Sequence, residues 1–274
     1  MNAGVAQRPR FNDPRYGQRV RAWEALTNVV TPSLLDALAP APGERVLDVG
    51  CGAGAATARA ARLVAPAGRV VGADLSPALV DIARHRAAHS DNVYFQVADL
   101  QTAQVLGGPF HAIMSQFGVM FFDEPVAAFT NIRRQLRPDG RICFACWQRA
   151  ESNPWSYAHL LTDLIAAPQS PSSIGPFALA EADHATALLR AADLDDVRVS
   201  SRRVNVEVRE SAIVDDDELA LMGVPPERIP DALQRVDQHL SAYRTASGNL
   251  ALPLAFHILT ARRCSRLGAH AARS

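Results

Sequence analysis

The chain has 274 residues with 28 basic and 28 acidic side chains, so its formal net charge at pH 7 is zero. At this length, one large domain or one domain with a modest cap can bury about three quarters of its unfolded surface. Hydrophobic residues make up 48% and charged residues 20% of the chain, which excludes the disordered and fibrous classes. The balanced charge argues against nucleic acid as the main partner.

Targeting signals and disulfides are not evident in the sequence. No run approaches the roughly 18 consecutive apolar residues of a membrane span. The first ten residues are polar and do not resemble a secretory signal. The four cysteines lie too far apart for a disulfide framework. We therefore expect a cytoplasmic protein without a membrane span.

The N-terminal 40 residues read as an arm followed by helix. Residues 1–15 have the composition of a flexible arm, and residues 19–38 predict one or two helices with Trp23 among their apolar positions. Strands are then predicted to begin near five positions, Arg45, Arg69, Asn92, Phe110 and Arg141. Helical spacing follows Ser76 and Asp123, and the latter helix is expected to end at residues 137–140. Strands alternating with helices imply a parallel sheet covered on both faces.

After residue 149 the alternation of strands and helices is interrupted. Four prolines and several serines break up residues 150–176, which read as an insertion over the mouth of the sheet. Alternating residues predict a closing strand pair over 197–208 and 252–262, with an amphipathic helix around 233–243 between the two strands.

The strongest chemical signal is the segment that runs from Val46 to Gly54. A buried strand leads into a turn with glycines at 50, 52 and 54, and this turn opens a helix. Glycines allow close approach of a ligand to the backbone, and a helix N-terminus presents free N–H groups. Asp48 precedes the first glycine, where a carboxylate would repel a pyrophosphate but could hold an ammonium group.

Two further acids stand at the ends of the next strands. Asp74 ends the second strand, where an acid in such sheets binds ribose hydroxyls, and Asp99 ends the third. Each acid alone is equally consistent with a helix cap or a turn. Three acids in register at successive strand ends are not explained by capping alone, and together they indicate a ligand site at this edge of the sheet.

At this point the sequence resembles a known family. The segments DVGCGAG, GADLS, ADL and RQLRPDGRICFACW are similar to those of class I S-adenosylmethionine-dependent methyltransferases, in the small-molecule branch that resembles ubiquinone and menaquinone biosynthesis enzymes. The clear resemblance covers residues 40–150. It implies S-adenosylmethionine as the cofactor, a small-molecule acceptor and methyl transfer to oxygen or carbon.

The resemblance also implies roles for individual residues. The glycine turn with Asp48 would carry the methionine part of the cofactor, Asp74 with Leu75 the ribose, and Asp99 with Leu100 the adenine. Ser115, Gln116 and Phe117 would lie beside the sulfonium and the acceptor. The residues expected to bind the cofactor are therefore, in chain order, Asp48, Gly50, Gly52, Gly54, Asp74, Leu75, Asp99, Leu100, Ser115 and Gln116. Candidates for positioning the acceptor are Tyr16, Trp23, Phe117 and His159, and no catalytic residue is assigned.

The expected fold is a doubly wound α/β architecture. The resemblance implies a Rossmann-like, mostly parallel sheet of seven strands whose last strand is antiparallel, together with a helical N-terminal arm and a cap insertion. The expected organisation is an arm over residues 1–40 and a methyltransferase domain over 41–274. Within that domain we expect a cofactor-binding core at 41–148, a cap at about 149–180 and C-terminal elements at about 181–267. A homodimer is compatible with the sequence.

Other chemistries are weighed against this reading. His111 stands where the family commonly has Asp, but it lies at the start of its strand, on the edge opposite the cofactor, so we assign it no catalysis. Cys143 and Cys146 form a CxxC inside a strand, where residues three apart point to opposite faces, so no metal site is expected. A nicotinamide-dependent oxidoreductase and a non-catalytic S-adenosylmethionine-binding protein are the alternative functions.

Overall fold

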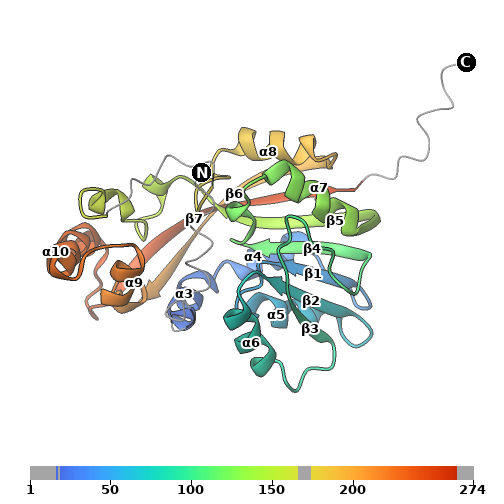
Figure 1. Cartoon of the computed structure of the whole chain (residues 1–274), viewed down its shortest axis with the longest axis horizontal. Coiled ribbons are helices and arrows are strands. Elements are labelled where there is room, and N and C mark those ends of the chain that lie inside the picture. Colours follow the sequence, from blue (N-terminus) through green and yellow to red (C-terminus); the bar gives the residue numbers. More distant parts are fainter. Residues whose placement is uncertain (1–16, 18, 166–173, 264–274) are drawn as a thin grey trace, which may run out of the picture.

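The computed structural model describes residues 17, 19–165 and 174–263 (Figure 1). Its centre is a seven-stranded sheet with the strand order β3-β2-β1-β4-β5-β7-β6. The strands are β1 (Arg45–Val49), β2 (Arg69–Asp74), β3 (Val93–Val97), β4 (Phe110–Gln116), β5 (Leu136–Trp147), β6 (Asp195–Val208) and β7 (Leu250–Arg262). The predicted doubly wound sheet is therefore confirmed.

The direction of the strands follows the prediction as well. Strands β1 to β5 run parallel to one another, while β7 is antiparallel to both β5 and β6. The chain moves outward from β1 to β2 and β3, and then returns to place β4 on the other side of β1. Because open α/β sheets bind ligands where the strand order reverses, the carboxyl ends of β1 and β4 mark the expected position of a site.

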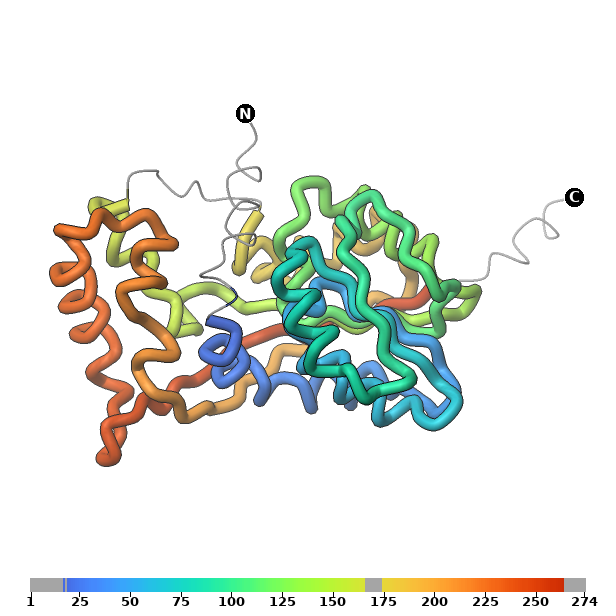
Figure 2. Tube along the Cα trace, turned by 60° about the horizontal axis from the view of Figure 1, so that its bottom comes forward, coloured from blue at the N-terminus to red at the C-terminus, as the bar shows by residue number. Residues whose placement is uncertain are grey.

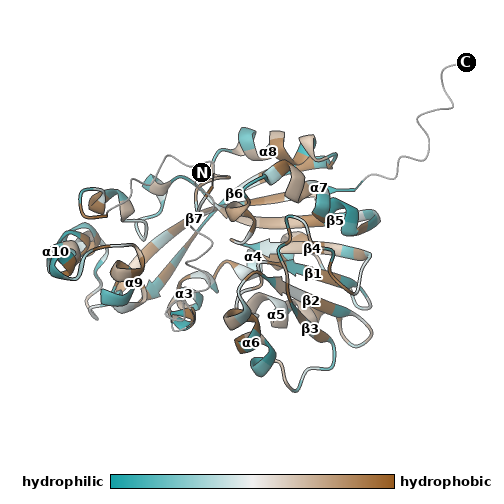
Figure 3. Cartoon of the chain, viewed as in Figure 1, coloured by the Kyte–Doolittle hydropathy of each residue, from teal (hydrophilic) through white to brown (hydrophobic). Residues whose placement is uncertain are grey.

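Helices enclose this sheet. They are α3 (Val20–Thr27), α4 (Thr31–Leu38), α5 (Ala55–Val64), α6 (Pro77–Arg86), α7 (Pro125–Gln135), α8 (Ala182–Ala191), α9 (Asp216–Leu221) and α10 (Ile229–Leu240). Helix α5 packs on β2, α6 on β3, and α4 on β5, while α7 and α8 pack together near β5 and β6. The central strands are coloured as apolar in Figure 3, and four phenylalanines at the middle of the core are fully buried, Phe110, Phe129, Phe144 and Phe256.

Local sequence explains where several helices begin. Ser76 caps α6 by accepting a hydrogen bond from the backbone N–H of Leu79, and Pro77 occupies the first helical turn. The helix after Asp123 ends two residues earlier than predicted, at Gln135. The reason is tertiary, because Leu136 takes an extended conformation and pairs with Phe110 of β4.

The C-terminal half builds a lobe beside the sheet. The long antiparallel ribbon of β6 and β7 leads to α9 and α10, which lie next to the short 3-10 turns of residues 150–161 (Figures 1 and 2). Arg235 of α10 joins the two parts through an ion pair with Asp163 at 2.7 Å. The strand pair and α10 match the prediction, whereas α9 was not predicted. In the described residues, no helix is long and apolar enough to cross a membrane.

Candidate functional site

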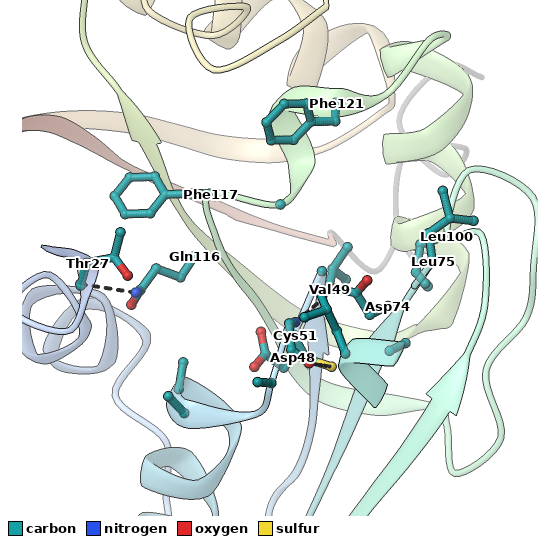
Figure 4. Close-up of a pocket in the computed structure, with 18 of the residues that line it drawn as sticks. Thr27, Asp48, Val49, Cys51, Asp74, Leu75, Leu100, Gln116, Phe117 and Phe121 are labelled. Carbon is teal, nitrogen blue, oxygen red and sulfur yellow. Dashed lines mark hydrogen bonds between the residues drawn. The ribbon is translucent and has the colours of Figure 1, made fainter. Parts of the chain in front are cut away.

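A cavity of about 260 Å³ opens at the carboxyl ends of β1, β2, β3 and β4 (Figure 4). It lies at the reversal of strand order described above. Most of the residues that the sequence singled out border this cavity, namely Asp48, Gly50, Gly52, Asp74, Leu75, Asp99, Leu100, Gln116, Phe117 and Trp23. The sheet topology thus brings together segments that are up to 94 residues apart in the chain, from Trp23 to Phe117.

The glycine turn forms the floor of the cavity. Gly50, Gly52 and Gly54 have φ angles of +67°, +54° and +85°, in the left-handed region that favours glycine. A Cβ atom at Gly50 would lie 2.8 Å from the Cα of Gly118, which follows β4, so the two loops touch backbone to backbone. A Cβ at Gly52 would meet nothing within 4 Å, so this part of the turn is open to a ligand.

Asp48 is the most unusual group on the wall. Its side chain is 1% exposed, and one carboxylate oxygen accepts a hydrogen bond from the Thr57 hydroxyl at 2.6 Å. The other oxygen, Oδ1, is buried without a hydrogen-bond partner in the described residues. Burial raises the pKa of Asp48 to about 7, the Thr57 bond opposes this, and the nearby charge of Asp74 adds to it. A cation in the cavity would complete the bonding of this carboxylate.

Asp74 is half-buried at the end of β2 and already holds two backbone groups. Its carboxylate accepts hydrogen bonds from the N–H of Gly52 at 2.8 Å and the N–H of Ser76 at 2.9 Å. Burial raises its pKa, and these bonds oppose the rise. Asp74 therefore ties the glycine turn to the start of α6, which is the kind of cap or turn role that the sequence had left open for each acid. Each oxygen keeps a second lone pair for a ligand.

The third strand contributes Asp99 and Leu100. Asp99 is half-buried, and its carboxylate accepts a hydrogen bond from the Gln101 N–H at 3.1 Å. Leu100 is buried and Leu75 is half-buried, and both border the cavity together with Ala98. A carboxylate flanked by aliphatic side chains suits a flat group with a polar edge.

The last two residues of β4, Ser115 and Gln116, have different roles at the site. Gln116 borders the cavity; its amide donates to the Thr27 carbonyl and accepts from the Thr31 hydroxyl, which anchors α3 and α4 to the sheet. Ser115 does not border the cavity. Its buried hydroxyl donates to the Val49 carbonyl at 2.7 Å and accepts from the Gly118 N–H at 3.2 Å. Ser115 therefore holds the β1 and β4 loops together.

Gly54 is likewise absent from the cavity wall. It precedes α5 as the capping residue, and a Cβ there would lie 2.8 Å from the Phe95 ring. Its contribution is the close packing of the helix start against β3, and the sequence pattern alone does not separate it from the two glycines that face the cavity.

The candidates for positioning an acceptor separate clearly. Trp23 and Phe117 border the cavity, whereas His159 is exposed and lies against His239, with ring centroids 5.6 Å apart. His159 is not among the lining residues, because its 3-10 turn belongs to the lobe around α10. Tyr16 lies outside the described residues.

Helix α3 contributes more to the site than Trp23, the residue of this helix that the sequence singled out. Besides Trp23 it places Val20, Glu24 and Thr27 on the cavity wall. Glu24 forms an ion pair with Arg86 of α6 at 2.5 Å, and Arg86 also reaches the Ala53 carbonyl at 3.3 Å. Arg19, the N-cap residue of α3, forms ion pairs with Asp215 and Glu218 in the N-cap and first turn of α9. Helix α3 is thus fastened on two sides as a roof over the glycine turn.

His111, Cys143 and Cys146, to which the sequence analysis assigned no catalytic or metal-binding role, lie where the sequence predicted. His111 stands at the start of β4 and accepts a hydrogen bond from the Arg45 N–H at 3.1 Å, at the end of the sheet opposite the cavity. Cys143 and Cys146 are fully buried in β5. Burial raises the pKa of the Cys143 thiol to about 12 and that of Cys146 further, so neither supplies a thiolate. Burial also raises the pKa of Cys51 in the glycine turn.

Comparison with known families identifies relatives over the N-terminal half. A family model described as a methyltransferase domain matches residues 46–140. The aklanonic acid methyltransferase DauC of Streptomyces sp. (strain C5) is 35% identical over 113 residues, which cover 40% of this chain and 51% of that protein. The ubiquinone/menaquinone biosynthesis C-methyltransferase UbiE of Teredinibacter turnerae is 31% identical over 135 residues, which cover 48% and 51%. The chain spans about half the length, or less, of the curated relatives it matches.

Solved structures extend the likeness to most of the fold. The YcgJ protein of Bacillus subtilis superposes with a TM-score of 0.60 at 16% identity, over 87% of this chain and 99% of that one. Phosphoethanolamine N-methyltransferase 2 of Haemonchus contortus, solved with S-adenosylhomocysteine, superposes with a TM-score of 0.56 at 16% identity, over 86% and 52%. At these identities the likeness establishes a shared fold.

Proposed function

We propose that this chain, which matches a methyltransferase-domain family model over residues 46–140, is a class I S-adenosylmethionine-dependent methyltransferase that transfers a methyl group to an oxygen or carbon of a small, largely apolar molecule. The observation that carries the proposal is the buried Asp48 carboxylate beside the glycine turn, with Oδ1 unpartnered in the described part of the chain. Such a group fits the ammonium of an amino acid and would repel a pyrophosphate.

The residues present fit each part of the cofactor. In this proposal Asp48 with the backbone of Gly50 and Gly52 holds the methionine part, because the turn is open at Gly52. Asp74 with Leu75 holds the ribose, using the lone pairs that Gly52 and Ser76 leave. Asp99 with Leu100 faces the adenine, and Gln116 borders the reacting end. Gly54 and Ser115 act through packing, since neither borders the cavity.

The chemistry required of the protein is mainly positioning. S-adenosylmethionine, when bound, supplies a methyl group on a positive sulfur, which keeps the electrons of the broken S–C bond as the acceptor forms a bond to the carbon. The chain aligns the acceptor and excludes water, and such orientation alone supplies a large part of a rate enhancement. Helix α3 and the aromatic residue Phe117 border the cavity and suit both tasks. A proton on the acceptor leaves to solvent or to a base that we do not assign.

The first test is binding. We expect calorimetry in EDTA to detect S-adenosylmethionine or S-adenosylhomocysteine binding, because the proposed contacts are made by protein groups without a metal. Absence of heat at ligand concentrations near 1 mM, which corresponds to only about 4 kcal/mol of affinity, would contradict the proposal. Quenching of NADH fluorescence by the protein would instead favour the oxidoreductase, and a failure of turnover with all acceptors would favour a non-catalytic binder.

A second test removes the Asp74 carboxylate. We expect Asp74→Ala to weaken S-adenosylhomocysteine binding by about 1.5–3 kcal/mol, roughly 10- to 100-fold, the range for hydrogen bonds to charged groups. Asp74 also accepts hydrogen bonds from Gly52 and Ser76, so some loss of melting temperature should accompany the change. Asp74→Asn is the matched control, since one amide oxygen can still accept from one of these N–H groups. Unchanged affinity in folded Asp74→Ala would rule out the ribose role.

The remaining expectations concern the surroundings of the site. We propose that the N-terminal arm, residues 1–15, and the cap at about 149–180 cover the acceptor. We also propose that residues 1–40 comprise this arm and the helices after it, that the cofactor-binding core is 41–148, and that the C-terminal elements occupy about 181–267. Residues 1–16 and 166–173 of these segments lie outside the described residues. The acceptor is proposed to be a small molecule and not a nucleic acid, so salt-sensitive binding of RNA or DNA would contradict it. A cytoplasmic location and a homodimer stay predictions.

A further inference from the structure

Phe117, the first residue after β4, has a strained backbone. Its φ angle is +63°, in a region that bulky side chains rarely adopt. The conformation is held by the Phe117 N–H, which donates to the Ala145 carbonyl of β5 at 3.0 Å. A fixed left-handed residue at this point turns the ring to a defined place on the cavity wall (Figure 4).

The Phe117 ring is stacked on a buried partner. Its centroid lies 3.7 Å from that of Trp147, and the two planes differ by 4°. The Trp147 and Trp155 ring centroids lie 4.8 Å apart, and Trp155 forms a T-shaped pair with Trp23 at 5.8 Å. Phe117 borders the cavity and Trp147 does not, so a ligand in the cavity meets the part of the Phe117 side chain that Trp147 leaves uncovered. The ring is therefore a rigid platform backed by a packed aromatic cluster.

A hydrogen-bond donor stands in the same cluster. The indole Nε1 of Trp23 is buried and has no hydrogen-bond partner in the described residues, while Trp23 borders the cavity. An indole N–H can only donate, and a buried donor without a partner destabilises the folded protein. An oxygen atom on a ligand would satisfy it. Gln116 ties α3 to the end of β4 beside Phe117, so the platform and the donor are held together.

We infer that the methyl acceptor is a planar conjugated ring carrying an oxygen substituent, which stacks on the free face of Phe117 and accepts a hydrogen bond from Trp23 Nε1. The inference rests on the proposed function and goes beyond it by naming two specificity-determining residues. Stacking on an aromatic ring increases the affinity of a flat ring about 2- to 10-fold beyond the effect of burial, and a saturated ring or an alkyl chain lacks this increase. The flat ring, and not merely an apolar acceptor, is what these contacts select.

The experiment measures the binding of three small probes to the full chain by equilibrium dialysis, with and without saturating S-adenosylhomocysteine. The probes are 1-naphthol, naphthalene, which lacks the oxygen, and decahydro-1-naphthol, which lacks the flat ring. We expect 1-naphthol to bind most tightly. No binding of 1-naphthol up to about 1 mM, or equal binding of decahydro-1-naphthol, overturns the inference.

Two variants locate the contacts. Phe117→Leu removes the π face and should weaken 1-naphthol about 2- to 10-fold with little effect on decahydro-1-naphthol. Trp23→Phe keeps a ring but removes the N–H, so it should weaken 1-naphthol about fivefold and leave naphthalene unchanged. Phe121→Leu makes the same chemical change as Phe117→Leu at another ring on the wall. An effect of Phe121→Leu equal to that of Phe117→Leu overturns the assignment of the platform.

Two further measurements keep the outcomes distinct. If Phe117→Leu does not fold, Phe117→Asn replaces it, because asparagine tolerates positive φ and also removes the ring. S-adenosylhomocysteine binding is measured by calorimetry on the same proteins. Failure of the wild-type protein to bind it contradicts the proposed function, whereas normal binding of it together with probe affinities that ignore Phe117 and Trp23 contradicts only this inference.

Discussion

Replacing Asp48 by asparagine is expected to stabilise the ligand-free protein at pH 8 while weakening the binding of S-adenosylhomocysteine at least about 100-fold. The stabilisation follows from the buried carboxylate, whose pKa is raised to about 7. An unfolded Asp ionises near pH 3.9, so about three pK units separate the two states, equivalent to at most about 4 kcal/mol. The loss of affinity follows because asparagine cannot neutralise an ammonium group in a buried site.

The pH dependence gives the sign of this effect. Between about pH 4 and 7 the folded protein holds a proton on Asp48 that the unfolded chain has released. The contribution of this group to stability is therefore fully present below pH 4, falls as the pH rises to 7, and is constant above it. Asparagine does not ionise, so the stability of the variant does not depend on this titration. The melting temperature of Asp48→Asn should therefore exceed that of the wild type by a large margin at pH 8 and by almost nothing at pH 4.

Ligand affinity should change with pH in the opposite sense. A bound cation favours the ionised carboxylate, so wild-type affinity should fall by up to about tenfold for each pH unit below 7, and the asparagine variant should lose this dependence. Calorimetry from pH 5.5 to 8 measures it. Asp81→Asn is the matched control, because Asp81 lies on the exposed surface of α6. Equal melting of wild type and Asp48→Asn at pH 8 would show that Asp48 is not held as a strained, buried acid.

Gly50→Ala is expected to destabilise the fold by about 3 kcal/mol or more. The added methyl would lie 2.8 Å from the Cα of Gly118, and backbone on both sides prevents relief by a side-chain rotation. The left-handed φ of +67° adds about 1 kcal/mol or more of its own. Denaturant unfolding of the ligand-free protein measures the loss.

Gly52→Ala distinguishes the cost of a left-handed backbone from the cost of a steric clash. Gly52 also has a positive φ, +54°, but its Cβ would meet nothing within 4 Å. We expect this variant to lose only about 1 kcal/mol of stability, yet to bind S-adenosylhomocysteine more weakly because the methyl stands in the open part of the turn. Similar stability losses for the two variants would show that contact between the β1 and β4 loops does not limit Gly50.

Much of the site could be predicted from spacing along the chain. Asp48, Asp74 and Asp99 follow successive apolar runs, and parallel strands that cross over in one direction must end at one edge. The position of His111 at the far end of β4 follows from the same rule. These predictions succeed because they depend only on strand direction, and the alternating pattern of strands and helices specifies that direction.

The sequence by itself determined the α/β class, the order of the main elements, and the gathering of three acids beside a glycine turn. Only the tertiary structure decided how those groups are used: that Asp74 bonds Gly52, that Ser115 and Gly54 lie beneath the wall, and that α3 forms a roof. It also decided the left-handed backbone of Phe117 and its stacking on Trp147. The physical reason is that side-chain direction and hydrogen-bond partners depend on residues distant in the chain, which packing brings into contact and which no local pattern encodes.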